Sequence, residues 1–370
     1  MNLFVADPGW SWWIIFYFFL GGIAAGAYFA ATLIDLVGTE ADRKVARAGY
    51  WIAFPLIVVC GVLLTLDLHR PERFWHMLFR SEVVHEAIAK GWPWTSAGWN
   101  EAAHAPLLKF WSPMSAGSWA LTLFGACSFL SFLGSLWPEG RLARWLRHGV
   151  IGKLLALVGC VTGLFVASYT GALVTATNQP IWSDTSWVAP LFLASAASTG
   201  IAVMILLARF TGADVSVLHR LGDADLYAIW LETVVFAVFI GSLSSLVSSM
   251  WHTPQGKLFL AGTALLALAA PLVLHLLGRR LGYVGAMAAA LCVLAGGFVL
   301  RYGLLTTAPE LLREEPALVH EQGAVEDRVR GGGPHFRISP EEGRERGGGG
   351  GADPGNKVNG EVEPRSKIFR

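Results

Sequence analysis

Eight long runs of mostly apolar residues constrain the fold of this 370-residue chain more than any other feature. A helix that crosses the hydrocarbon core of a bilayer needs roughly 20 apolar residues. The runs lie at about residues 10–37, 50–68, 113–136, 150–176, 189–208, 226–249, 257–277 and 281–304. Because lipid offers no hydrogen-bond partners, the backbone of each run must form a helix. The sequence therefore predicts an all-α integral membrane protein with eight transmembrane helices.

The composition and the distribution of charge fit this interpretation. Charged residues make up 15% of the chain, whereas they make up about a quarter of a soluble protein. The net charge of +1 gives no reason to expect nucleic acid as a partner. The end of the chain differs, because it is polar and contains the glycine run 347–351, and such a segment lacks the apolar residues to fold alone. We therefore expect an eight-helix membrane domain over residues 1–305 and a disordered tail over residues 306–370.

Lysine and arginine indicate how the chain is oriented in the membrane. They are denser in the short loops after the first, third, fifth and seventh runs, and Arg43, Lys44 and Arg47 follow the first run. The positive-inside rule places these loops in the cytoplasm. Both termini and the long loop over residues 69–112 then lie on the outer side.

A cluster of ionisable residues follows the second run directly and includes Asp67, His69, Arg70 and Arg73. Tyr169, in the fourth run, reaches a similar depth, since it lies roughly 10 Å inside the outer end at 1.5 Å per residue. A quinone needs an apolar slot for its ring and tail, and polar groups near its carbonyls of which at least one exchanges a proton. Tyr169, Asp67 and His69 could provide these groups, whereas Arg70 and Arg73 are equally suited to lipid phosphates. Anchoring and transport remain alternative interpretations of the cluster.

Tryptophan is concentrated on the predicted outer side, where Trp75, Trp92 and Trp94 all fall in the long loop. Aromatic belts usually occupy both membrane interfaces. The excess on one side predicts a docking surface for a partner protein, to which Arg70 and Arg73 also contribute. A thick aromatic belt combined with a folded loop is the alternative.

Several ionisable residues lie within or at the ends of the predicted spans, and three of them lie toward the inner side. Asp35 ends the first on the inner side, Glu232 lies about two turns into the sixth, and His275 ends the seventh on the inner side. Ionisable residues inside a membrane commonly mark proton or ion routes. We therefore expect a proton path from the cytoplasm that uses Glu232, Asp35 or His275. Snorkelling side chains or structural pairs are the alternatives.

Histidine and cysteine form no pattern that predicts a bound metal. Haem held by two histidines needs both of them facing each other inside the bundle, and only His275 lies clearly within a run. The four cysteines fall inside apolar runs and form no CxxC pair. We therefore expect neither haem nor metal in this chain.

Four motifs, taken together and in order, resemble the NrfD/PsrC family, the membrane subunits of polysulphide-reductase-type complexes. The motifs are FLGGIAAGA at residues 19–27, DLHRPERFW at 67–75, SPMSAGSW at 112–119, and YTGAL at 169–173 with PIW at 180–182. The resemblance covers about residues 10–305. It implies a haem-free protein whose eight helices form two four-helix bundles in the cytoplasmic (inner) membrane of a prokaryote.

The resemblance also implies a role in a respiratory chain. Such subunits exchange electrons between menaquinone or ubiquinone and a four-cluster ferredoxin-like iron–sulfur subunit. That partner passes them to a molybdopterin catalytic subunit or a multihaem cytochrome. By the same resemblance, Tyr169 would hydrogen-bond a quinone carbonyl, and Asp67 and His69 would line the pocket or its proton path. Some relatives place an Asn or His early in the first helix near the quinone, and in this chain the second quinone contact would be Ser11, Tyr17 or His69.

Two further functions are compatible with the sequence. An ion-coupled secondary transporter would use Glu232 and Asp35 as its coupling carboxylates. A passive anchor would only tether a catalytic partner to the membrane. On each of these interpretations, and on the quinone interpretation, the chain is not catalytic alone.

Overall fold

A computed structural model describes residues 9–314 apart from residues 40–41, 69, 105–111, 137–139, 141–148, 178, 209, 211, 213–214 and 244–245. The side chains of residues 101–104, 278–281 and 314 also lie outside this description. His69 and residues 315–370 of the predicted tail are therefore not described. Every regular element in the described ranges is a helix.

Eight of the described segments are long and apolar enough to cross a membrane, which confirms the number of spans predicted from the sequence. Six of them are single helices, namely α1 (Trp12–Val37), α2 (Arg43–Asp67), α5 (Pro113–Leu136), α7 (Val150–Thr175), α8 (Val188–Ala208) and α9 (Val215–Ser242). The seventh begins with α11 (Pro254–Lys257) and the π-helical segment η2 (Leu258–Ala269), and continues into α12 (Ala270–Glu314). Gly282, with φ of 55°, interrupts α12 and separates the seventh span from the eighth.

The eighth span is longer than the sequence predicted, because α12 continues past residue 304 to Glu314. Leu304, Ala308 and Leu311 are completely buried, at the spacing of one helix face. The first residues of the predicted tail therefore belong to the packed helix.

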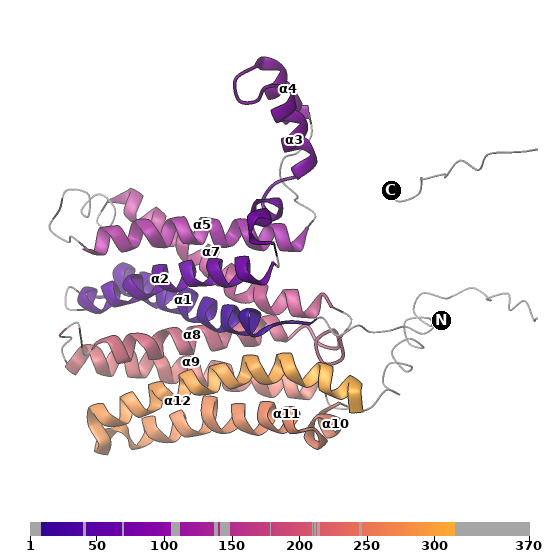
Figure 1. Cartoon of the computed structure of the whole chain (residues 1–370). Coiled ribbons are helices and arrows are strands. Elements are labelled where there is room, and N and C mark those ends of the chain that lie inside the picture. Colours follow the sequence, from indigo (N-terminus) through magenta and orange to yellow (C-terminus); the bar gives the residue numbers. More distant parts are fainter. Residues whose placement is uncertain are drawn as a thin grey trace, which may run out of the picture. The chain divides into compact units, whose positions relative to one another are not determined.

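Short elements connect the spans on one side. The long loop between α2 and α5 contains η1 (Pro71–Met77), α3 (Ser81–Ala89) and α4 (Ser96–His104), and α10 (Val247–His252) follows α9. Helices α3 and α4 pack against each other, as Figure 1 shows. Two side chains of α5 hold the start of the loop: Ser115 Oγ donates to the carbonyl of Met77 at 2.7 Å, and Trp119 Nε1 donates to that of Leu78 at 2.9 Å. We call the end of the helices that carries this loop the long-loop end, and the opposite end the short-loop end.

Helix α1 is central to the packing, because it contacts α2, α7, α8 and α12. Its contact with α8 brings the two backbones together. A Cβ at Gly26 would lie 1.8 Å from the carbonyl oxygen of Ala196, and one at Gly200 would lie 2.2 Å from the carbonyl carbon of Gly26. Small residues permit such close contact between membrane helices. Because α7 also contacts α8, the division into two four-helix bundles stays a prediction.

Candidate functional site

Tyr169 lies on α7, close to the long-loop end, and its ring covers Gly117 of α5. A Cβ at Gly117 would lie 2.2 Å from Cε1 of Tyr169, so only glycine leaves room for this ring. Phe165, one turn earlier, stacks on Tyr169 with the ring centroids 5.9 Å apart. The side chain of Tyr169 is thus fixed between two helices and remains only half-buried.

An apolar hollow of about 580 Å³ lies between α5 and α7, next to the ring that stacks on this tyrosine. Phe165 lines the hollow and also stacks on Tyr169. Its walls are formed by Ala116, Trp119, Ala120, Thr122, Leu123 and Ala126 of α5 and by Val161, Thr162 and Phe165 of α7. Leu123, Val161 and Phe165 are themselves exposed at membrane depth, so the hollow opens toward lipid.

Tyr17 of α1 lies in the same region and is 4% exposed. Its hydroxyl is close enough to Tyr169 and Cys60 for an electrostatic interaction. The thiol of Cys60 donates to the backbone carbonyl of Tyr17 at 3.8 Å. Tyr169 and Tyr17, the two tyrosines that the sequence predicted as quinone contacts, therefore lie in the same region.

Asp67 ends α2 at the long-loop end and accepts a hydrogen bond from the hydroxyl of Ser11. This bond joins the end of α2 to the residue that precedes α1. His69, the third predicted residue of this cluster, lies outside the described residues. The carboxylate of Asp67 is thus held in place on the long-loop end of the molecule.

The predicted docking residues occupy two kinds of position in the long loop. Arg70, Arg73 and Trp94 are exposed, and Trp94 is 90% exposed. Trp75 and Trp92 are half-buried. The ring of Trp75 contacts those of His76 and His85, and Trp92 contacts Trp99 edge-on, so both help to fold the loop itself.

Glu232 of α9 is 1% exposed and lies deep within the helices. Ser198 of α8 donates a hydrogen bond of 2.5 Å to Glu232 Oε2. Ser195, one turn earlier on α8, also contributes to the hydrogen bonding around this carboxylate. Two serines of α8 therefore face one buried carboxylate of α9.

Arg301 of α12 completes this group and is also 1% exposed. Its Nη1 donates to Ser195 Oγ at 3.1 Å and to the carbonyl of Gly297 at 2.9 Å, and its Nε donates to the carbonyl of Phe18 at 3.1 Å. A Cβ at Gly22 of α1 would lie 2.6 Å from Nη2, which explains the glycine there. Arg301 and Glu232 are therefore joined through a serine hydroxyl without a direct ion pair.

His275 does not stand alone at the short-loop end, because its Nε2 lies 2.9 Å from Oδ2 of Asp225. Asp225 is completely buried on α9 and precedes Glu232 by two turns on the same face. Asp225, Ser195 and Ser198 were not predicted from the sequence. The spacing of the two acids on α9 could have revealed Asp225, whereas the serines carry no signal that distinguishes them from packing residues.

Asp35 belongs to a different cluster, on the other side of α1. It hydrogen-bonds to Tyr50 of α2 and interacts electrostatically with Tyr28. The hydroxyls of Tyr28 and Ser131 lie 2.8 Å apart. The three residues of the predicted proton path thus separate: His275 and Glu232 lie along one line with Asp225, and Asp35 lies apart.

The buried polar groups follow one another along the helices from the short-loop end, with a gap between the carboxylates of Asp225 and Glu232. This polar line runs from His275 through Asp225 and Glu232 to Ser195 and Arg301. Arg301 reaches the carbonyl of Phe18, the residue next to Tyr17. Over the part of the chain that the structure describes, no three of its histidines, cysteines and acids gather in a way that could hold a metal ion.

Comparison with known proteins identifies the family of this chain. The profile of the family described as "Polysulphide reductase, NrfD" matches residues 6–310. A polysulfide reductase chain of Wolinella succinogenes is 30% identical over 80% of this chain and 93% of the relative. Protein NrfD of Escherichia coli is 25% identical over 80% of this chain and 93% of the relative. A tetrathionate reductase subunit of Salmonella typhimurium is 30% identical over 55% of this chain and 50% of the relative. This multi-pass membrane protein therefore belongs to the polysulphide reductase NrfD family.

Proposed function

We propose that this chain is the membrane subunit of a respiratory oxidoreductase complex and exchanges electrons between membrane quinone and a docked partner. The partner would be a four-cluster ferredoxin-like iron–sulfur protein, followed by a molybdopterin catalytic subunit or a multihaem cytochrome. Family membership supports this, because relatives are named as chains or subunits of polysulfide and tetrathionate reductases. The quinone would be menaquinone or ubiquinone, taken from the inner membrane of a prokaryote.

The observation that carries the proposal is the position of Tyr169 beside the apolar hollow between α5 and α7. Ligand sites are mostly apolar and contain a few placed polar groups. The hollow opens toward lipid and suits an isoprenoid tail, and the hydroxyl of Tyr169 is positioned to donate to a ring carbonyl. Tyr17 and Asp67 supply further polar groups in this region. His69 lies outside the described residues, and its role at the site rests on the sequence alone.

Conversion of a quinone into its quinol takes up equal numbers of electrons and protons, so the site needs a proton route. The polar line from His275 to Arg301 supports such a route. Asp225 Oδ1 and Glu232 Oε1 are buried without a hydrogen-bond partner among the described residues, so each can accept a bond from a water molecule. The two carboxylates lie roughly 10 Å apart along α9, a distance that bridging water would span. Asp35 would belong to a separate branch of the proton route.

The long loop supports the docking part of the proposal. Arg70, Arg73 and Trp94 present two cations and an aromatic ring to solvent, and arginine and tryptophan are enriched where proteins bind each other. By the positive-inside rule, the distribution of Lys and Arg predicts that this loop and both termini lie on the outer side of the membrane. The electron-accepting or electron-donating partner would then sit above the quinone site.

Replacing Tyr169 with phenylalanine tests the quinone site. We expect quinone-coupled turnover of the purified complex to fall by about 10-fold or more, because one hydrogen bond to a carbonyl contributes about 0.5–1.5 kcal/mol and a bond to developing charge contributes more. Turnover of the partner with a soluble dye should remain unchanged. Tyr227→Phe is the matched control, because Tyr227 is 76% exposed on the lipid-facing side of α9. Equal loss of both activities in Tyr169→Phe, or loss of neither, would contradict the assignment.

A further inference from the structure

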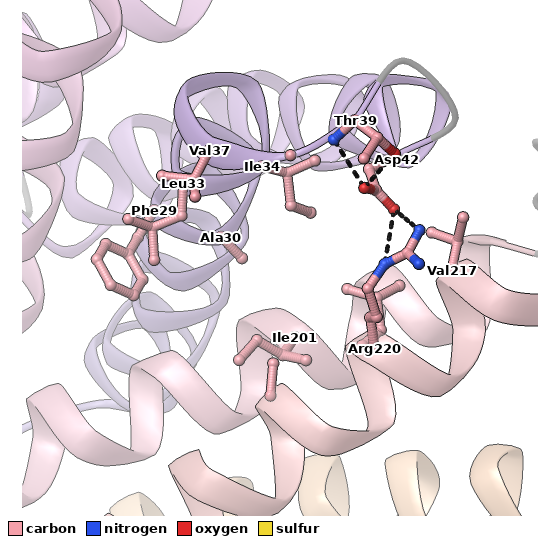
Figure 2. A pocket seen from close by; sticks show the side chains of 13 residues that line it. Phe29, Ala30, Leu33, Ile34, Val37, Thr39, Asp42, Ile201, Val217 and Arg220 are labelled. Carbon is pink, nitrogen blue, oxygen red and sulfur yellow. Dashed lines mark hydrogen bonds and ion pairs between the residues drawn. The ribbon is translucent and has the colours of Figure 1, made fainter.

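A second cavity, of about 410 Å³, lies at the short-loop end, far from Tyr169 along the helices. Figure 2 shows it between α1, which contributes Phe29, Leu33 and Val37, and α9, which contributes Val217 and Arg220. Ile201 of α8 forms part of its lining between them. Most of the other lining residues are apolar, and the polar side chains among them are those of Thr39, Asp42 and Arg220.

The charges of Asp42 and Arg220 lie together at one end of the cavity, as Figure 2 shows. Arg220 donates to Oδ1 of Asp42 through both Nε and Nη2, and Thr39 donates to Oδ2 through its backbone N–H at 2.9 Å and its hydroxyl at 2.7 Å. Burial alone would raise the pKa of Asp42, but these hydrogen bonds outweigh it and hold the pKa below its usual value. Asp42 is therefore ionised at neutral pH, with both oxygens occupied.

Arg220 retains donors that Asp42 does not use. Its side chain is 52% exposed, and its Nη1 has no hydrogen-bond acceptor among the residues that the structure describes. This unused Nη1 gives the rim of the cavity a donor for an anionic oxygen.

The other end of the cavity opens to the hydrocarbon of the membrane. Leu33 and Val37 line the cavity and are 45% and 85% exposed. Exposed aliphatic side chains on a spanning helix contact lipid chains. A molecule that fills this cavity therefore needs a long apolar chain entering from the side and an anionic group at the level of Arg220.

We propose that this cavity is a binding site for an anionic phospholipid, with one acyl chain between α1 and α9 and the phosphate at Arg220. Basic pockets between membrane helices on the cytoplasmic side are typical binding sites for anionic lipid head groups. The distribution of Lys and Arg places this end in the cytoplasm. The proposal does not depend on quinone chemistry, because the cavity and Tyr169 lie at opposite ends of the helices.

The test uses the intact complex in vesicles that contain phosphatidylglycerol with a photoreactive diazirine in its acyl chain. Phosphatidylcholine with the same photoreactive acyl chain serves as the comparison, because its head group has no net charge. After irradiation, we expect labelled peptides from residues 29–37 and 217–224, and labelling by phosphatidylglycerol about fivefold above phosphatidylcholine. A fivefold ratio corresponds to about 1 kcal/mol, the contribution of one arginine near an anionic head group.

Two variants separate the acyl chain from the head group. Ala224→Trp fills the cavity and should clearly reduce labelling of residues 29–37 by both lipids, because Ala224 lines it. Arg220→Gln should leave labelling but remove the preference for phosphatidylglycerol. Val58→Trp is the matched control, since Val58 is a lipid-facing residue of α2 that is 48% exposed and does not line the cavity.

Three results would overturn the proposal. The first is labelling of residues 29–37 that Ala224→Trp leaves unchanged. The second is equal labelling by the two lipids in the wild-type complex. The third is a diazirine-bearing quinone that labels these peptides more strongly than phosphatidylglycerol, which would make the cavity a quinone site. The wild-type comparison remains decisive even where a variant fails to assemble.

Discussion

Replacing Glu232 with glutamine is expected to lower quinone-coupled turnover of the assembled complex by at least about 100-fold, the lower end of the contribution that proton-transfer groups make. Glutamine has the shape of glutamate and can still accept the hydrogen bond that Ser198 donates. It cannot take up or release a proton, so the polar line would be interrupted at its deepest carboxylate. Dye-linked turnover of the docked partner should be unaffected, because it bypasses the membrane.

Two further variants make this result specific. Asp225→Asn should reproduce the loss, because Asp225 lies on the same line and pairs with His275. Asp223→Asn should have no effect, since Asp223 is an exposed carboxylate on the same helix. If Glu232→Gln turns over like the wild type, Glu232 is not on the proton route. If the dye-linked activity falls equally, its role is structural.

Replacing Arg301 with methionine is expected to destabilise the protein by about 3–5 kcal/mol, the usual cost of leaving one buried charge without the opposite charge that interacts with it. Glu232 would then be buried with no cation near it, and Ser195 would lose the donor that now reaches it at 3.1 Å. The measurement is thermal unfolding of the purified complex in detergent. The lowered stability should appear as a lower midpoint.

The same substitution in a Glu232→Gln background supplies the control. Removing both members of a buried pair is often nearly neutral, so Arg301→Met should cost much less there than in the wild type. An equal cost in both backgrounds would show that Arg301 stabilises the protein through its own hydrogen bonds to Phe18, Ser195 and Gly297 and not through the charge of Glu232. That outcome would remove the electrostatic link between Arg301 and Glu232.

The eight spans could be predicted from the sequence because each is a long apolar run, and the energetic cost of exposed backbone in lipid leaves one solution. The end of α12 could not be predicted from the sequence. Thr306, Thr307 and Pro309 resemble the start of a polar segment, but Thr306 and Thr307 donate their hydroxyls back to carbonyls of their own helix. Burial of Leu311 then keeps this turn packed.

The site was predictable only in part. Tyr169 and Asp67 were proposed from the sequence because each is a polar side chain at a similar depth on one side of the membrane, and Tyr17 because the resemblance expects a polar group early in the first helix. The hydrogen-bond partners of the site residues could not be predicted, since a sequence gives the depth of a residue along a helix but not the direction in which it faces across the bundle. Ser11 and Asp67 are separated by 56 residues, and Ser195 and Arg301 by 106.

Depth alone also grouped residues that the fold separates. Asp35 and His275 both lie near the short-loop end, yet Asp35 bonds to Tyr50 and His275 pairs with Asp225. Gly117 is a residue that the sequence could not single out, because a glycine in an apolar run is indistinguishable from an ordinary packing residue. Its function becomes visible only when the ring of Tyr169 is seen to cover it.

The central claim, that quinone binds beside Tyr169, is tested most directly by photolabelling the native complex in its membrane with an azido-quinone. The account predicts label on peptides that contain residues 165–173 of α7 and 113–120 of α5, which border the hollow and the tyrosine. Excess unlabelled menaquinone or ubiquinone should displace it. Label that is absent from both peptides, or that excess quinone does not displace, would contradict the account.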